Sequence, residues 1–128
     1  MRDGVRLGTN VCLPSGMGPW PAVLVRTPYS KDRQFENGEQ TYISRQIAFV
    51  AQDVRGLYRS EGEYRPFVDD GKDGYDTVEW IARQAWSNGK VGMTGASAPG
   101  LIANQAALAA PPHLICLFVV KAVPGTYR

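Results

Sequence analysis

Residues 91 to 100 read Val-Gly-Met-Thr-Gly-Ala-Ser-Ala-Pro-Gly, a short apolar strand that runs into a serine flanked by glycines. An alanine-rich stretch follows and predicts a helix. A strand, a tight turn that carries a serine, and a helix form the layout of a nucleophile elbow, whose strained backbone lifts one hydroxyl clear of the sheet. The pattern therefore predicts that Ser97 is a nucleophile.

The neighbours of Ser97 fit this layout with one departure. Gly95 leaves room inside the turn, and the backbone N–H of Ala98 faces an oxyanion at the start of the helix. Pro99 lacks an N–H, but that donor has no partner in the first turn of a helix. The common pattern is G-x-S-x-G, whereas here the second glycine is displaced to Gly100. The alternative is an ordinary strand–helix connection with Ser97 as N-cap.

Length and composition place the chain among folded single domains. It has 128 residues, no internal repeat and no linker, so we expect one domain over 1–128. The hydrophobic share of 44% and the charged share of 20% argue against disorder. A net charge of +2 from scattered basic residues predicts no nucleic-acid binding. With no membrane-length apolar stretch and no signal segment, we expect a cytoplasmic protein that does not bind membranes.

The cysteines and the histidine give no sign of a cofactor. Cys12 and Cys116 lie far apart in apolar stretches, which favours two buried free thiols over a disulfide. His113 is the only histidine, and no cluster of His, Cys, Asp and Glu has the spacing of a metal site. The sequence therefore implies neither a metal nor a cofactor.

The remaining pattern alternates strands and helices. The later strands are apolar throughout, as expected when helices cover both faces of a sheet. We therefore expect an α/β fold with a mostly parallel sheet flanked by helices, and an antiparallel hairpin as a candidate opening. The expected strands are 5–13, 22–26, 47–52, 91–94 and 114–120, the expected helices are 39–46, 73–84 and 101–109, and 55–69 is an expected surface loop.

In such a sheet, reacting groups gather at the carboxyl ends of the strands. Segments 26–30, 53–56 and 95–97 all follow strands on this side. Tyr29 lies in a proline-stiffened turn, where its phenol could donate to an oxyanion beside the Ala98 N–H. The alternative is a tyrosine that only packs its loop.

Several motifs, in this order, resemble those of X-Pro dipeptidyl-peptidase-like serine hydrolases of the cocaine-esterase type, which have an α/β-hydrolase fold. The resemblance covers nearly the whole chain. The motifs are Met1-Arg-Asp-Gly-Val-Arg-Leu7, Arg26-Thr-Pro-Tyr-Ser-Lys31, Asp53-Val-Arg-Gly56, Ser60-Glu-Gly62, Asp76-Thr-Val-Glu-Trp80, Gln84-Ala-Trp-Ser-Asn-Gly-Lys-Val-Gly92 and the elbow.

The resemblance implies a role for each site residue. Ser97 would be acylated by a small-molecule ester or amide, while the Tyr29 O–H and the Ala98 N–H would form the oxyanion hole. The 53–62 signature would be structural and would order the loop after its strand. The family usually has Tyr after the nucleophile, so Ala98 removes a bulky wall of the pocket.

The family's catalytic Asp and His lie well beyond the elbow. We therefore expect this chain to be an N-terminal piece of a catalytic domain, without the cap and the C-terminal portion. His113 is a poor substitute, because the helix after Ser97 runs away from the catalytic edge for roughly 15 Å. Four carboxylates are better explained as loop and helix-start charges than as triad members: Asp69, Asp70, Asp73 and Glu79.

Two interpretations follow for function. One is a serine hydrolase that acts through an acyl-serine and is weak or inactive as this isolated chain. The other is a non-catalytic remnant or interaction module that self-associates, or pairs with a missing segment, through an exposed sheet edge. For the first, we expect strained backbone angles at Ser97 and the Tyr29 hydroxyl within a few ångströms of the space above it.

Overall fold

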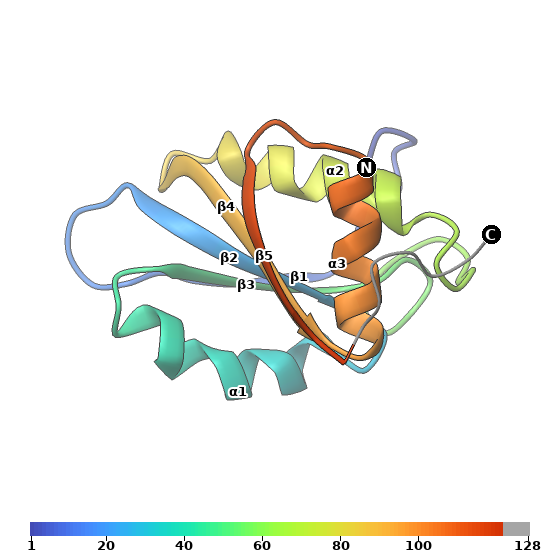
Figure 1. Ribbon diagram of the computed structural model, residues 1–128, viewed down its shortest axis with the longest axis horizontal. Helices are drawn as coiled ribbons and strands as arrows, with labels where there is room; N and C mark the ends of the chain where they lie inside the picture. Colours follow the sequence, from blue (N-terminus) through green and yellow to red (C-terminus); the bar gives the residue numbers. More distant parts are fainter. Residues whose placement is uncertain (122–128) are drawn as a thin grey trace.

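The computed structural model describes residues 1–121, apart from the side chain of residue 37, as a five-stranded sheet flanked by three helices (Figure 1). The strand order is β1-β3-β2-β4-β5, which confirms the expected α/β class. The elements are β1 (Thr9–Cys12), β2 (Trp20–Thr27), α1 (Lys31–Ile43), β3 (Ala48–Asp53), α2 (Asp70–Ala82), β4 (Ser87–Ala96), α3 (Ala98–Leu108) and β5 (Leu114–Val120).

The sheet is parallel except at β1. β1 pairs antiparallel with β3, with Thr9 opposite Gln52, so the expected opening hairpin with β2 is wrong. The expected strand over 5–13 also shrinks to four residues. The residues before β1 bind the loop after β3 instead. The Arg6 N–H donates to the Glu61 carboxylate, and the Gly8 N–H donates to the Ser60 hydroxyl. Within residues 1–121, no helix is long and apolar enough to cross a bilayer.

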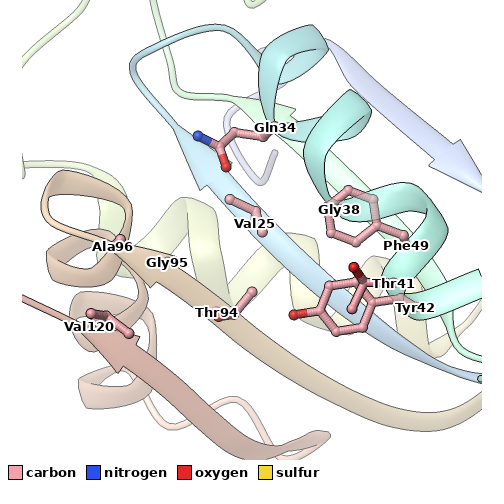
Figure 2. Close-up of a pocket in the computed structure, with 10 residues that line it drawn as sticks. All are labelled: Val25, Gln34, Gly38, Thr41, Tyr42, Phe49, Thr94, Gly95, Ala96 and Val120. Carbon is pink, nitrogen blue, oxygen red and sulfur yellow. The ribbon is translucent and has the colours of Figure 1, made fainter.

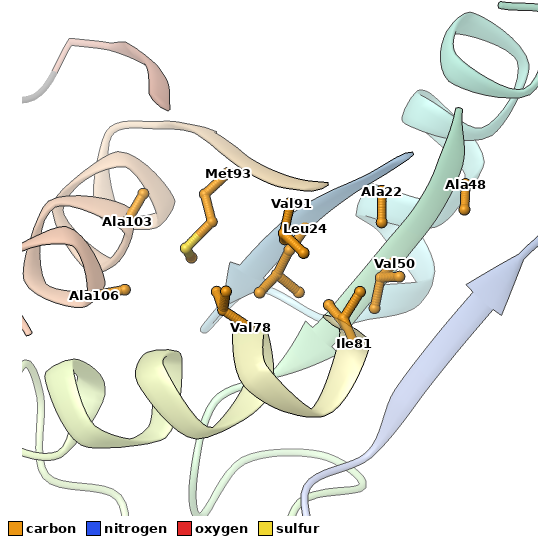
Figure 3. Packing of buried hydrophobic residues seen from close by; sticks show 10 residues of the cluster. All are labelled: Ala22, Leu24, Ala48, Val50, Val78, Ile81, Val91, Met93, Ala103 and Ala106. Atoms are coloured by element: carbon orange, nitrogen blue, oxygen red, sulfur yellow. The ribbon is translucent and has the colours of Figure 1, made fainter. Parts of the chain in front are cut away.

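Helices α2 and α3 cover one face of the sheet, and α1 covers part of the other (Figure 1). The main core lies under α2 and α3, where side chains from β2, β3 and β4 meet both helices (Figure 3). Its members are Ala22, Leu24, Ala48, Val50, Val78, Ile81, Val91, Met93, Ala103 and Ala106. On the α1 face, Phe49 stacks on Tyr42 with ring centroids 5.3 Å apart.

β5 is covered on one face only. Its apolar sequence predicted burial on both faces, but Ile115 is 61% exposed and Phe118 is 71% exposed. Cys116 is exposed as well, so the expectation of a buried thiol there is wrong, whereas Cys12 is half-buried and both thiols are free. The reason is that α3 packs against one face of β5 while α1 lies over β2 and β3.

Helix α1 begins at Lys31, eight residues before the start that the sequence predicted. A buried carboxylate sets this start, because the Lys31 N–H donates to Asp53 Oδ1 at 2.7 Å. Asp53 Oδ2 accepts from the Arg59 N–H at 3.2 Å, and the Asp53 carbonyl accepts from the Ser60 hydroxyl at 2.6 Å. The Asp53 N–H donates to the Gly8 carbonyl at 3.0 Å. One residue thus joins the end of β3 to three other segments.

We predict that Asp53→Asn destabilises the fold by about 1–3 kcal/mol. The amide has one oxygen acceptor, whereas the buried N–H of Lys31 and the partly buried N–H of Arg59 each bind a separate carboxylate oxygen. The matched control is Asp32→Asn, which changes an exposed carboxylate of α1 and should cost well under about 1 kcal/mol. Urea unfolding of the two variants measures both effects. Equal losses would show that Asp53 does not hold these segments.

Candidate active site

Ser97 occupies the turn between β4 and α3, exposed to solvent, with φ 59° and ψ −121°. These angles are rare for a residue with a side chain, which confirms the predicted strain at this position. Gly95 makes the turn possible, because a Cβ there would collide with the backbone of Pro99. The Ser97 N–H donates to the Val120 carbonyl at 2.9 Å, so β5 holds the turn from the other side.

Ala98 is the first residue of α3, where backbone N–H groups have no partner within the helix. The positive end of the helix dipole lies here as well and favours negative charge next to Ser97. Pro99 lies in the first turn and removes no bond of the helix. The Ala98 N–H is therefore available to an acceptor outside the helix.

Tyr29 is held on both sides. Its N–H donates to the Thr27 hydroxyl at 2.9 Å, and two residues later the Lys31 N–H is bound to Asp53. Between these anchors, Ser30 has a φ of 88°, a strained angle that the flanking bonds maintain. Tyr29 and Ala98 line the same cavity, so the structure brings these two predicted residues together. The reach of the Tyr29 hydroxyl to the oxyanion stays a prediction.

The loop after β3 has the structural role that the resemblance implied for residues 53–62. Besides the contacts of Asp53, the Gly56 N–H donates to the Glu61 carbonyl at 2.9 Å. Gly56 has a φ of 81°, and a Cβ there would collide with the backbone of Tyr64. The loop is therefore closed on itself and holds the β2–α1 turn in place through Asp53.

Beneath this region lies a buried charge network that the sequence analysis missed. Arg26 is fully buried, and its Nη1 lies 3.0 Å from Asp70 Oδ1. Its Nε donates to Gln52 Oε1 at 2.7 Å, and Gln52 Oε1 also accepts from the Thr77 hydroxyl at 3.0 Å. Burial raises the pKa of the Asp70 carboxyl, although Arg26 opposes this shift. An arginine inside the apolar run Val-Leu-Val-Arg-Thr was the signal for a buried partner.

The other carboxylates that we assigned to loops and helix starts also have cationic partners. Asp73 binds Arg55 at 2.7 Å, which keeps the pKa of the guanidinium raised. Asp69 binds Arg65 at 2.6 Å. Asp69, Asp70 and Asp73 lie at the start of α2, as expected. Glu79 lies near the end of that helix instead, where it contacts His113, so its assignment to a loop or helix start is wrong.

His113 lies at the opposite edge of the sheet from Ser97. Its carbonyl accepts from the N–H of Val91, near the start of β4, while Ser97 follows the end of that strand. The strand between Val91 and Ala96 rises roughly 16 Å. The His113 ring pairs with Glu79 through Nδ1 at 2.9 Å. His113 is therefore too far from Ser97 to bind its hydroxyl, as the sequence analysis expected.

A second hollow, of about 260 Å³, lies between α1 and the uncovered part of the sheet (Figure 2). Tyr42 and Gln34 of α1 border it on one side, and Thr94, Ala96 and Val120 border it on the other (Figure 2). Ser97 does not line it. Within residues 1–121, no three His, Cys, Asp or Glu side chains are arranged to hold a metal ion.

Comparison with known proteins agrees with this geometry. Residues 3–128 match the X-Pro dipeptidyl-peptidase (S15 family). Cocaine esterase of Rhodococcus sp. (strain MB1 Bresler) is 42% identical over 133 residues, which cover 100% of this chain and 23% of that protein.

Two solved structures are also similar. An α-amino acid ester hydrolase has a TM-score of 0.85 at 35% identity, and the match covers 91% of this chain and 23% of that one. An aminopeptidase of a marine sediment archaeon, Thaumarchaeota archaeon, has a TM-score of 0.83 at 31% identity, with the same coverage. This chain therefore spans about a quarter of the length of these relatives.

The angles of Ser97 generate a prediction on stability. Ser97→Gly should be more stable than Ser97→Ala by about 1 kcal/mol, because glycine adopts a positive φ without strain and this gain exceeds its greater flexibility when unfolded. Urea unfolding of the two variants under identical conditions gives the difference. A glycine variant that is less stable than the alanine variant would contradict the strained turn.

Proposed function

The chain belongs to the X-Pro dipeptidyl-peptidase (S15) family of hydrolases, and from this membership we propose that Ser97 is the nucleophile of an acyl transfer. The observation that carries the proposal is the strained, exposed turn of Ser97 beside the first N–H groups of α3. An ester or an amide of a small molecule is the substrate.

In the proposed reaction, Ser97 Oγ attacks the carbonyl carbon and its proton passes to a base. The carbonyl oxygen becomes negative and accepts from the Ala98 N–H and the Tyr29 O–H. The alcohol or amine then leaves, and water hydrolyses the acyl-serine. Because His113 is bound to Glu79 at the far edge of the sheet, we propose that the base comes from polypeptide other than these 128 residues.

Catalysis by the isolated chain should accordingly be slow. Serine hydrolases without triad members keep on the order of 10³–10⁴-fold acceleration over water, from the oxyanion hole and binding. We predict very slow turnover of p-nitrophenyl acetate, with little difference between the wild type and Ser97→Ala, because the acceleration that remains does not depend on the serine. Initial rates of p-nitrophenol release measure this. Rapid turnover that depends on Ser97 would show that a base is present in the chain, and His113→Ala would then be tested.

A trapping experiment tests the nucleophile itself. Imidazole in solution supplies a base, so incubation with p-nitrophenyl acetate and imidazole should acetylate Ser97, as detected by peptide mass spectrometry. Ser44→Ala, a change at an exposed serine that caps α1, should leave the modification unchanged. Acetylation of lysines alone, with none at Ser97, would overturn the proposed role.

We also propose a second role, self-association through β5. The strand Leu-Ile-Cys-Leu-Phe-Val-Val carries no charge, and in residues 1–121 it pairs only with β4. An uncharged apolar edge strand can pair with its own copy in antiparallel orientation about a two-fold axis. The small net charge of +2 opposes such an approach only weakly.

We predict that the chain forms dimers at micromolar concentrations and that Phe118→Lys, which puts a charge on the exposed edge strand, makes it monomeric. Met17→Lys is the matched control, since Met17 is 98% exposed in the β1–β2 connection. Sedimentation velocity over a concentration series measures the mass. A wild-type monomer throughout would contradict self-association.

A further inference from the structure

The cavity that Tyr29 and Ala98 share has a volume of about 390 Å³ and lies beside the elbow. Its wall is largely apolar and is built from four separate segments. The aromatic residues Tyr29, Tyr64 and Phe67 line it, together with the aliphatic residues Val54, Leu57 and Ile102. For comparison, an apolar cavity of about 150 Å³ is large enough to bind benzene.

The cavity adjoins the elbow through Ala98, the residue after Ser97, although Ser97 itself does not line it. Ala98 offers its N–H at the start of α3, and Ile102 follows one helical turn later on the same side of the helix. A group attached to a carbonyl above Ser97 can therefore pass over Ala98 and contact Ile102. Because Ala98 ends at Cβ, its small side chain leaves this passage open.

The charge of the wall is balanced. Asp70 is the one acidic or basic side chain that lines the cavity in the described chain, and Arg26 already binds it at 3.0 Å. Asp73, one turn along α2, is bound in turn by Arg55. Arg55 also binds the half-exposed Asp3, which does not line the cavity. The one charged group of the lining is thus paired with a buried guanidinium and is not free to bind an ammonium.

From these observations we propose that the cavity binds a neutral apolar group of the substrate, of the size of an aromatic ring or a branched aliphatic chain, and that Ala98 controls entry to it. The use of this pocket in catalysis rests on the proposed function. Its capacity to bind does not, because burial of apolar surface provides the driving force whether or not Ser97 reacts.

Titration of the 128-residue chain with benzyl alcohol tests the pocket, followed by methyl and amide NMR. We expect saturable shifts at the methyl groups of Val54, Leu57 and Ile102 and at the amide of Ala98. Ala98→Phe should abolish these shifts, because the larger ring fills the passage. Tyr64→Ala should weaken binding, while Tyr58→Ala, at a more exposed tyrosine that does not line the cavity, should leave it unchanged.

Benzylammonium and benzoate provide the charge test and should both bind more weakly than benzyl alcohol. Shifts that do not saturate, or that persist in Ala98→Phe, would overturn the pocket. Tighter binding of either ion would overturn its neutral character. Saturable binding without acetylation of Ser97 would leave the pocket standing and remove the nucleophile, so the two proposals fail separately.

Discussion

The carboxylate of Asp53 is the contact on which the site depends. It fixes the first N–H of α1 and the N–H of Arg59, and so determines where the β2–α1 turn lies relative to the end of β3. Tyr29 lies inside that turn, with Thr27 binding it from the other side. The hydrogen bonds of the neighbouring Tyr29 and Lys31 N–H groups hold Ser30 at its strained φ. A residue with no direct part in the proposed reaction thereby positions one of the two proposed oxyanion donors.

The proposed nucleophile, Ser97, depends on a different and weaker support. The Ser97 N–H bonds to Val120, the last residue of β5, and β5 has the most exposed apolar side chains of the sheet. An edge strand that pairs on one side opens more readily than a central strand. Whatever covers β5 therefore also stiffens the turn that carries Ser97. Association and catalysis, proposed from separate observations, are linked through one strand.

The sequence predicted best where structure is decided locally. The turn at Ser97 was predictable because strand, glycine, serine and helix follow one another directly. The start of α1 was not, since it depends on Asp53, 22 residues further along the chain. The exposure of Cys116 was also unpredictable, because apolar composition does not reveal whether a helix covers both faces of a strand. The expected opening hairpin was wrong for a similar reason: β1 pairs with β3, and the order of strands within a sheet is a tertiary property.

The buried network around Arg26 fixes how the elements next to Ser97 pack against one another. A buried ion pair contributes little net stability, since desolvation opposes the attraction between the charges, but breaking it is costly. It therefore disfavours alternative packings more than it favours folding. The pair of Arg26 and Asp70 joins β2 to the first turn of α2, directly below the cavity shared by Tyr29 and Ala98. Specific geometry is thus enforced beside the two proposed oxyanion donors, and apolar packing supplies stability in the core beneath α2 and α3.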